Sequence, residues 1–196
     1  MQPGAAVQQA KDDFSLVGLL AANVVALSVA YATGMPLREL MIVYWIQSVI
    51  IGIISFLRLC TVAYVDTRNP VATQLGDRAF HAIFFVVHYG FFHIVYLFFL
   101  GPFPPERMQS YLLCGLVFAA GHGYSFLRNF RRDRAGRPDI SLVMWLPYAR
   151  VLPMHLVIIF GSNLPGTANL LIFGALKIAA DAVMHITEHR VLAPRR

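Results

Sequence analysis

Histidine and aspartate side chains recur inside the apolar stretches of this sequence. His88 lies in the middle of FFVVHYGFFHIVYLFFL, His155 follows a proline in WLPYARVLPMH, and Asp181 lies in LKIAADAVMHITEH. Imidazole nitrogen and carboxylate oxygen are ligands of zinc and of non-haem iron. Matching the depths of three helices predicts a metal site of His88, His155 and Asp181, with His185 one helical turn nearer the cytoplasm.

Such a site suits a hydrolase. Zinc that keeps one position open for water lowers the pKa of that water toward neutrality, and the substrate inside a membrane would be a lipid or another amphipathic molecule. The sequence holds no HExxH signature, so this hypothesis depends on depth matching alone. A haem held axially by two of the histidines is an alternative.

Lys177, Asp181, His185 and His189 follow one another at a spacing of four residues. This spacing puts them on one face of a helix, and such a face avoids lipid. Two hypotheses remain open beside the metal site. The stripe forms a proton relay or the path of a small transporter, or its members are only a buried ion pair in a non-catalytic membrane subunit.

Other polar residues are expected to support the site. His88 and His93 are about 140° apart on a regular helix, so His93 is expected to hydrogen-bond a neighbouring helix. Arg150 is expected to extend toward the cytoplasmic head groups, with an inward role as counter-ion or anion clamp as the alternative. The supporting residues, by hydrogen bonds or ion pairs, are Gln47, Tyr89, His93, Arg150 and Lys177.

Composition identifies the elements that position these residues. Of the 196 residues 58% are hydrophobic and 13% charged, and the mean hydropathy is +0.62, whereas a soluble domain has roughly 25% charged residues. A membrane span needs about 20 apolar residues. Six stretches qualify, which predicts an all-α bundle of six transmembrane helices: 14–33, 39–61, 79–100, 109–127, 140–162 and 167–188.

The charges indicate orientation and partners. Twelve of the sixteen lysines and arginines lie at the termini and in the second and fourth loops, which predicts a multi-pass inner (plasma) membrane protein with both termini cytoplasmic. One domain, 14–189, then lies between the N-terminal segment 1–13 and the basic tail 190–196. The net charge of +6 is spread between apolar blocks, so membrane lipids rather than nucleic acid are the expected partners. Homo-oligomerisation is left open.

Four segments, YWIQSVIIG, FFVVHYGFFHIVYLFFL, YARVLPMH and LKIAADAVMHITEH, resemble a prokaryotic family of small polytopic membrane proteins known as a domain of unknown function. The resemblance covers about 39–189. It implies functional positions at His88, Tyr89, Gly90, His155, Lys177, Asp181 and His185. The family pattern has an acidic residue where this chain has Gln47, which argues against a two-metal mechanism. The resemblance implies no activity.

Overall fold

The computed structural model describes residues 20, 23–24, 27–28, 31–32, 34–61, 74–136, 139–160 and 166–191, and every regular element among them is a helix. Some side chains in these helices are not described, including those of His185 and His189. The elements are α2 (Leu37–Thr61), α3 (Gln74–Leu100), the short 3-10 helix η1 (Pro105–Arg107), α4 (Met108–Gly136), α5 (Ile140–Trp145), α6 (Tyr148–Phe160) and α7 (Gly166–Val191).

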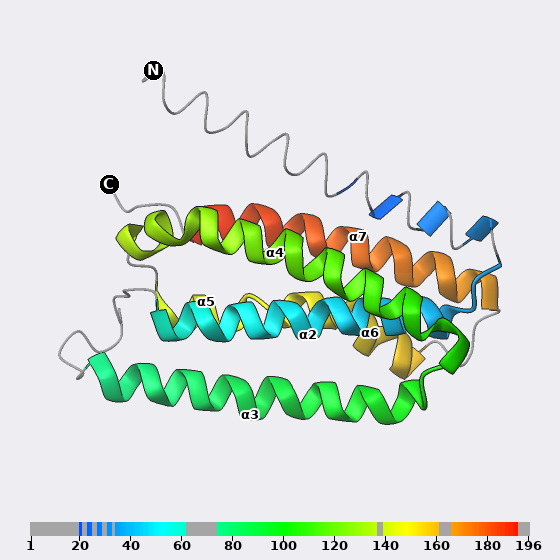
Figure 1. Ribbon diagram of the computed structural model, residues 1–196, viewed down its shortest axis with the longest axis horizontal. Coiled ribbons are helices and arrows are strands. Elements are labelled where there is room, and N and C mark those ends of the chain that lie inside the picture. Colours follow the sequence, from blue (N-terminus) through cyan, green and yellow to red (C-terminus); the bar gives the residue numbers. More distant parts are fainter. Residues whose placement is uncertain are drawn as a thin grey trace, which may run out of the picture.

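The long helices lie side by side along one axis and alternate in direction through the chain (Figure 1). Four stretches are long and apolar enough to cross a membrane: Leu37–Thr61, Gly76–Leu100, Pro105–Arg128 and Ile140–Ile159. They correspond to the second to fifth predicted spans. The first predicted span falls largely outside the described residues, and α7, which includes the sixth, has several side chains that are not described. The described part of the chain is therefore helical, and four of its stretches have the composition of membrane spans.

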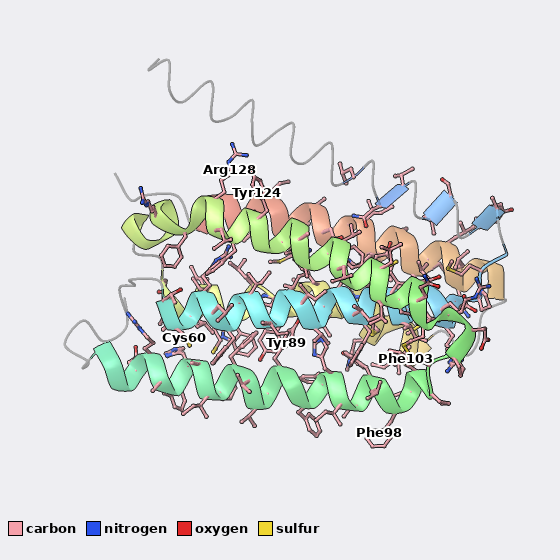
Figure 2. The ribbon with its side chains drawn as sticks, viewed as in Figure 1. Cys60, Tyr89, Phe98, Phe103, Tyr124 and Arg128 are labelled. Atoms are coloured by element: carbon pink, nitrogen blue, oxygen red, sulfur yellow. The ribbon has the colours of Figure 1, made fainter. Side chains whose placement is uncertain are left out.

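Helix α2 lies at the centre of the bundle. It contacts α3, α4, α5, α6 and α7, and residues from all of its turns are buried. A small residue lets α3 approach closely, because a Cβ added at Gly52 would lie 2.6 Å from Cε1 of the Tyr89 ring. Figure 2 shows Tyr89 between α2 and α3, whereas Phe98 on the opposite face of α3 points away from the bundle.

The fifth predicted span is two helices. Asp139 caps the first, since its carboxylate accepts hydrogen bonds from the backbone N–H groups of Ser141 and Leu142. The break comes at Pro147, which has no N–H to continue the hydrogen-bond ladder. Pro153 lies inside α6, and the helix continues past it.

Candidate functional site

The polar cluster of this protein is a buried ion pair on α7 together with the polar side chains that surround it. Lys177 is 4% exposed and Asp181 is fully buried, and the lysine Nζ lies 2.5 Å from Oδ2 of the carboxylate. Asn23 donates a second hydrogen bond, of 3.0 Å, from its Nδ2 to the same oxygen. The other oxygen, Oδ1, has no hydrogen-bond partner among the described residues. One carboxylate oxygen thus accepts two hydrogen bonds, and the other accepts none from the described residues.

An aromatic ring of α2 covers the lysine. The Nζ of Lys177 lies 4.8 Å from the centroid of the Tyr44 ring, a distance at which a cation is attracted to an aromatic face. Tyr44 in turn packs edge-on against Phe173, one turn before Lys177 on α7. These contacts hold the ammonium group between α2 and α7 and keep it from lipid.

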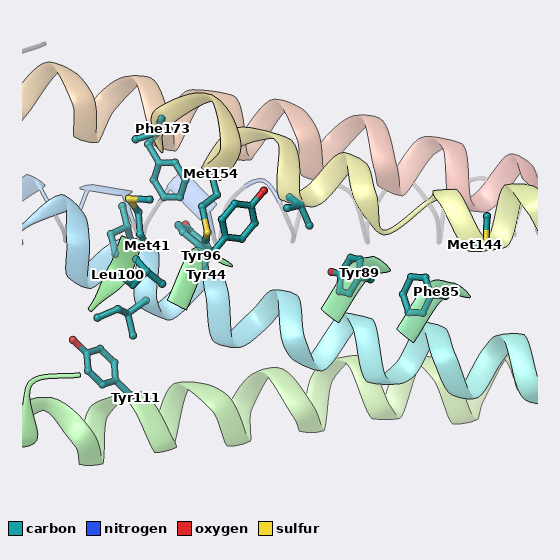
Figure 3. Packing of buried hydrophobic residues seen from close by; sticks show 14 of the residues in the cluster. Met41, Tyr44, Phe85, Tyr89, Tyr96, Leu100, Tyr111, Met144, Met154 and Phe173 are labelled. Carbon is teal, nitrogen blue, oxygen red and sulfur yellow. The ribbon is translucent and has the colours of Figure 1, made fainter. Parts of the chain in front are cut away.

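A small cavity adjoins the ion pair. Its volume is about 10 Å³, which is room for about one water molecule. Figure 3 shows Tyr44, Tyr96, Met154 and Phe173 gathered around this part of the bundle. Side chains from α2, α3, α6 and α7 line it: Tyr44, Ser48, His93, Tyr96, Arg150, Val151, Pro153, Met154, Phe173 and Lys177.

Arg150 lines this cavity, a position that fits the inward alternative for this residue. The residue lies midway along the span Ile140–Ile159. The inward alternative describes its position. Arg150 therefore joins the ion pair to the tyrosine and histidine side of the cavity.

On the α3 side of the cavity, hydrogen bonds join Tyr89 and His93 to each other and to Ser48 of α2. His93 Nδ1 lies 2.8 Å from the carbonyl oxygen of Tyr89, and because a carbonyl only accepts, this nitrogen carries the proton. In the neutral ring Nε2 then accepts from the Ser48 hydroxyl, 3.0 Å away on α2. The Tyr89 hydroxyl donates to the Ser48 carbonyl oxygen at 3.1 Å. His93 thus makes the interhelical hydrogen bond expected of it.

Two histidine–tyrosine pairs join α3 to α6. His88 Nδ1 lies 3.0 Å from the Tyr148 hydroxyl, and His155 Nδ1 lies 2.9 Å from the Tyr96 hydroxyl. Phe92 lies between the pairs and packs edge-on against both imidazoles. His88 and Tyr96 are eight residues apart on α3, so their Cα atoms are about 12 Å apart along that helix. His88 and His155 do not share one depth, contrary to the sequence-based expectation.

The metal ligands expected from the sequence are consequently not assembled among the described side chains. In that part of the chain no group of three or more His, Cys, Asp or Glu is placed to hold a metal ion. His88 and His155 each hydrogen-bond a tyrosine, and Asp181 is bound by Lys177 and Asn23. The side chain of His185, the fourth expected ligand, is not described. The described donors therefore do not form a group of three or more ligands for zinc or iron.

Several residues of the cluster were not singled out from the sequence. Tyr44, Ser48, Tyr96 and Asn23 belong to it, while Gln47, which was singled out, is buried with no hydrogen-bond partner for its Oε1 among the described residues. A signal was present on the third apolar stretch. Tyr89, His93 and Tyr96 have the spacing of one helical face, in a stretch otherwise composed of Phe, Val, Leu and Ile.

Comparison with known proteins identifies a family and no activity. Neither the curated proteins nor the solved structures gave a match to this chain. A family described as one of unknown function, DUF6498, matches residues 5–196 and so includes every residue of the polar cluster. The chain belongs to this family of unknown function.

Proposed function

We propose that this protein is a six-span membrane proton carrier, either a proton relay or a small proton-coupled transporter, with both termini cytoplasmic. One observation carries the proposal: Asp181 is a fully buried carboxylate with one oxygen held by Lys177 and Asn23 and the other without a hydrogen-bond partner among the described residues. Such intramembrane carboxylates are typical of proton paths. Oδ1 is the atom that takes up the proton.

The groups around the cavity supply the next steps. Lys177 shares its ammonium proton with the carboxylate and also lines the water-sized cavity. A water molecule there would adjoin both Lys177 and the Ser48–His93 pair, which is already joined by a hydrogen bond. In this proposal a proton passes from Asp181 and Lys177, through the cavity water, to His93.

The test is proton flux across a bilayer. The full chain, reconstituted into liposomes that contain a pH-sensitive dye and carry a potassium diffusion potential, should acidify or alkalinise the lumen faster than protein-free liposomes. The Asp181→Asn variant should lose this flux, because an amide holds the same hydrogen bonds but does not titrate. Asp77→Asn is the matched control, since Asp77 lies in the first turn of α3 and outside the cluster.

Two results would contradict the proposal. Flux no greater than that of protein-free liposomes would exclude proton transport by this protein. Equal flux from the parent and Asp181→Asn proteins would exclude Asp181 as the residue that carries the proton. A loss that is shared by Asp77→Asn would show a general failure of the variants to fold, and the flux would then be compared in Asp181→Glu, which keeps a titratable carboxyl.

The metal-dependent hydrolase is less well supported by the geometry. The imidazoles of His88 and His155 are engaged by tyrosines at two different levels of the bundle. No contact among the described residues directs both of them toward Asp181. The proton carrier needs only the contacts that Asp181, Lys177 and the cavity residues already make.

A further inference from the structure

A second cavity lies at the end of the bundle where α2 and α7 begin and where α3 and α6 end. Its volume is about 270 Å³, close to the lower end of the roughly 300–1,000 Å³ of pockets that bind small molecules. Leu100 is buried in its lining, whereas Phe99 is largely exposed, so the cavity reaches the surface of the bundle. The described residues that line it are Leu37, Arg38, Met41, Phe99, Leu100, Val157, Ile158 and Asn169.

In a membrane, this cavity would lie at the level of the lipid head groups. Arg38 is the second residue of one apolar span, Leu100 is the last residue of another, and Ile158 is the second-last residue of a third. The ends of membrane spans lie at the boundary between hydrocarbon and head groups. A lipid that enters the cavity from the bilayer therefore brings its head group and the first part of its acyl chains.

Arg38 is exposed and places a cationic group beside the apolar walls of the cavity. Its Nε donates a hydrogen bond to the carbonyl oxygen of Leu100 and its Nη2 donates one to that of Pro102. Both acceptors are neutral, and the carboxylate of the adjacent Glu39 pairs with Arg107. The two carbonyl bonds orient the guanidinium group and leave the N–H groups of Nη1 outside both of them.

We propose that this cavity binds one phospholipid, with a phosphate oxygen at Nη1 of Arg38 and the first part of one acyl chain against the apolar lining. Arginine suits phosphate, because its planar guanidinium group presents several N–H donors. Arg38 is the only charged residue in the described lining, and most of the others are apolar. A free phosphate would leave these apolar walls without a partner, which favours the lipid. The site goes beyond the proposed proton carrier and does not depend on it.

The experiment is native mass spectrometry of the delipidated full chain in detergent, titrated with dioleoyl phosphatidylglycerol. We expect one lipid adduct per chain at lipid concentrations well below those that give further adducts. Arg38→Gln should weaken this adduct by about tenfold or more, the effect of losing a charge-assisted hydrogen bond. Ile158→Trp, which fills the cavity and leaves Arg38 in place, should also weaken it. Arg128→Gln is the control, because it removes an exposed arginine at the opposite end of the spans.

Four outcomes would overturn the lipid site. They are no early adduct in the parent, an adduct that Arg38→Gln and Ile158→Trp both leave intact, an equal loss in Arg128→Gln, and displacement of the lipid by glycerol phosphate or oleate at equal concentration. The third would show general attraction of head groups to basic residues, and the fourth would show a site for the phosphate alone or for a fatty acid. Circular dichroism during thermal unfolding checks the fold of each variant. Because Ile158→Trp acts on the acyl chain alone, it tests the site even if Arg38→Gln does not fold.

Discussion

Two polar regions of the bundle differ in charge and in the number of helices they join. The Lys177–Asp181 region carries formal charges and collects side chains from α2, α3, α6 and α7 around one cavity. The His88–Tyr148 and Tyr96–His155 pairs join only α3 and α6, and each hydrogen bond can form between neutral partners. Burying charge costs far more than burying a satisfied imidazole. The charged region is therefore the one that packing alone explains least.

The largest effect should follow removal of the lysine. Lys177→Met leaves the carboxylate of Asp181 buried without its cation, and breaking a buried pair in this way costs about 3–5 kcal/mol of unfolding free energy. Unfolding in mixed micelles of increasing SDS content would measure this change. The double variant Lys177→Met, Asp181→Leu should recover much of the loss. A single variant as stable as the parent would contradict a buried charged pair.

The next largest effect should follow a steric change between α2 and α3, in neither polar region. Gly52→Ala places a methyl group 2.6 Å from the Tyr89 ring, and overpacking of this kind costs about 1–3 kcal/mol. Gly90→Ala on α3 is the matched control, because nothing lies within 4 Å of its added Cβ. The same SDS titration compares them. Equal stability of the two variants would show that α2 and α3 do not pack this closely.

A smaller effect should follow removal of one neutral hydrogen bond. Tyr148→Phe deletes the hydroxyl that bonds His88, and hydrogen bonds between membrane helices average about 0.6 kcal/mol. The loss of unfolding free energy in Tyr148→Phe, divided by the loss in Lys177→Met, measures how much more the charged region contributes than one neutral histidine–tyrosine pair. If Tyr148→Phe cost as much as Lys177→Met, the histidine–tyrosine pairs would be more than packing contacts.

The smallest effect should be on bound metal. We expect elemental mass spectrometry of detergent-purified protein to find zinc and iron well below one atom per chain, with no change in the double variant His88→Ala, His155→Ala. The reason is that both imidazoles bond tyrosines and are offset along the bundle. Near-stoichiometric metal in the parent that is lost in the double variant would restore the hydrolase hypothesis. It would also contradict the assignment of His88 and His155 to neutral histidine–tyrosine pairs.

The sequence predicted the class of fold and part of the site. Apolar stretches of span length predicted the helices, and the four-residue spacing of Lys177 and Asp181 predicted their pairing, because both signals are local. The position of Arg150 and the offset of His88 from His155 depend on how helices rotate and slide against one another. A single sequence holds little information on that relation, so it did not predict the hydrogen-bond partners of these side chains.

The hydrogen bond from Asn23 to Asp181 spans 158 positions of the chain. In the proposed six-span arrangement, Asn23 would enter the bilayer long before its partner has been translated. In the same arrangement, α7 would follow with Lys177 and Asp181, each of which alone costs about 2.5–3.5 kcal/mol at the centre of an inserting helix. Because Lys177 and Asp181 pair within one helix, they would enter the membrane as a neutral unit. The side-chain amide of Asn23 would then donate its hydrogen bond to Asp181. A chain truncated before α7 would lack this partner for Asn23.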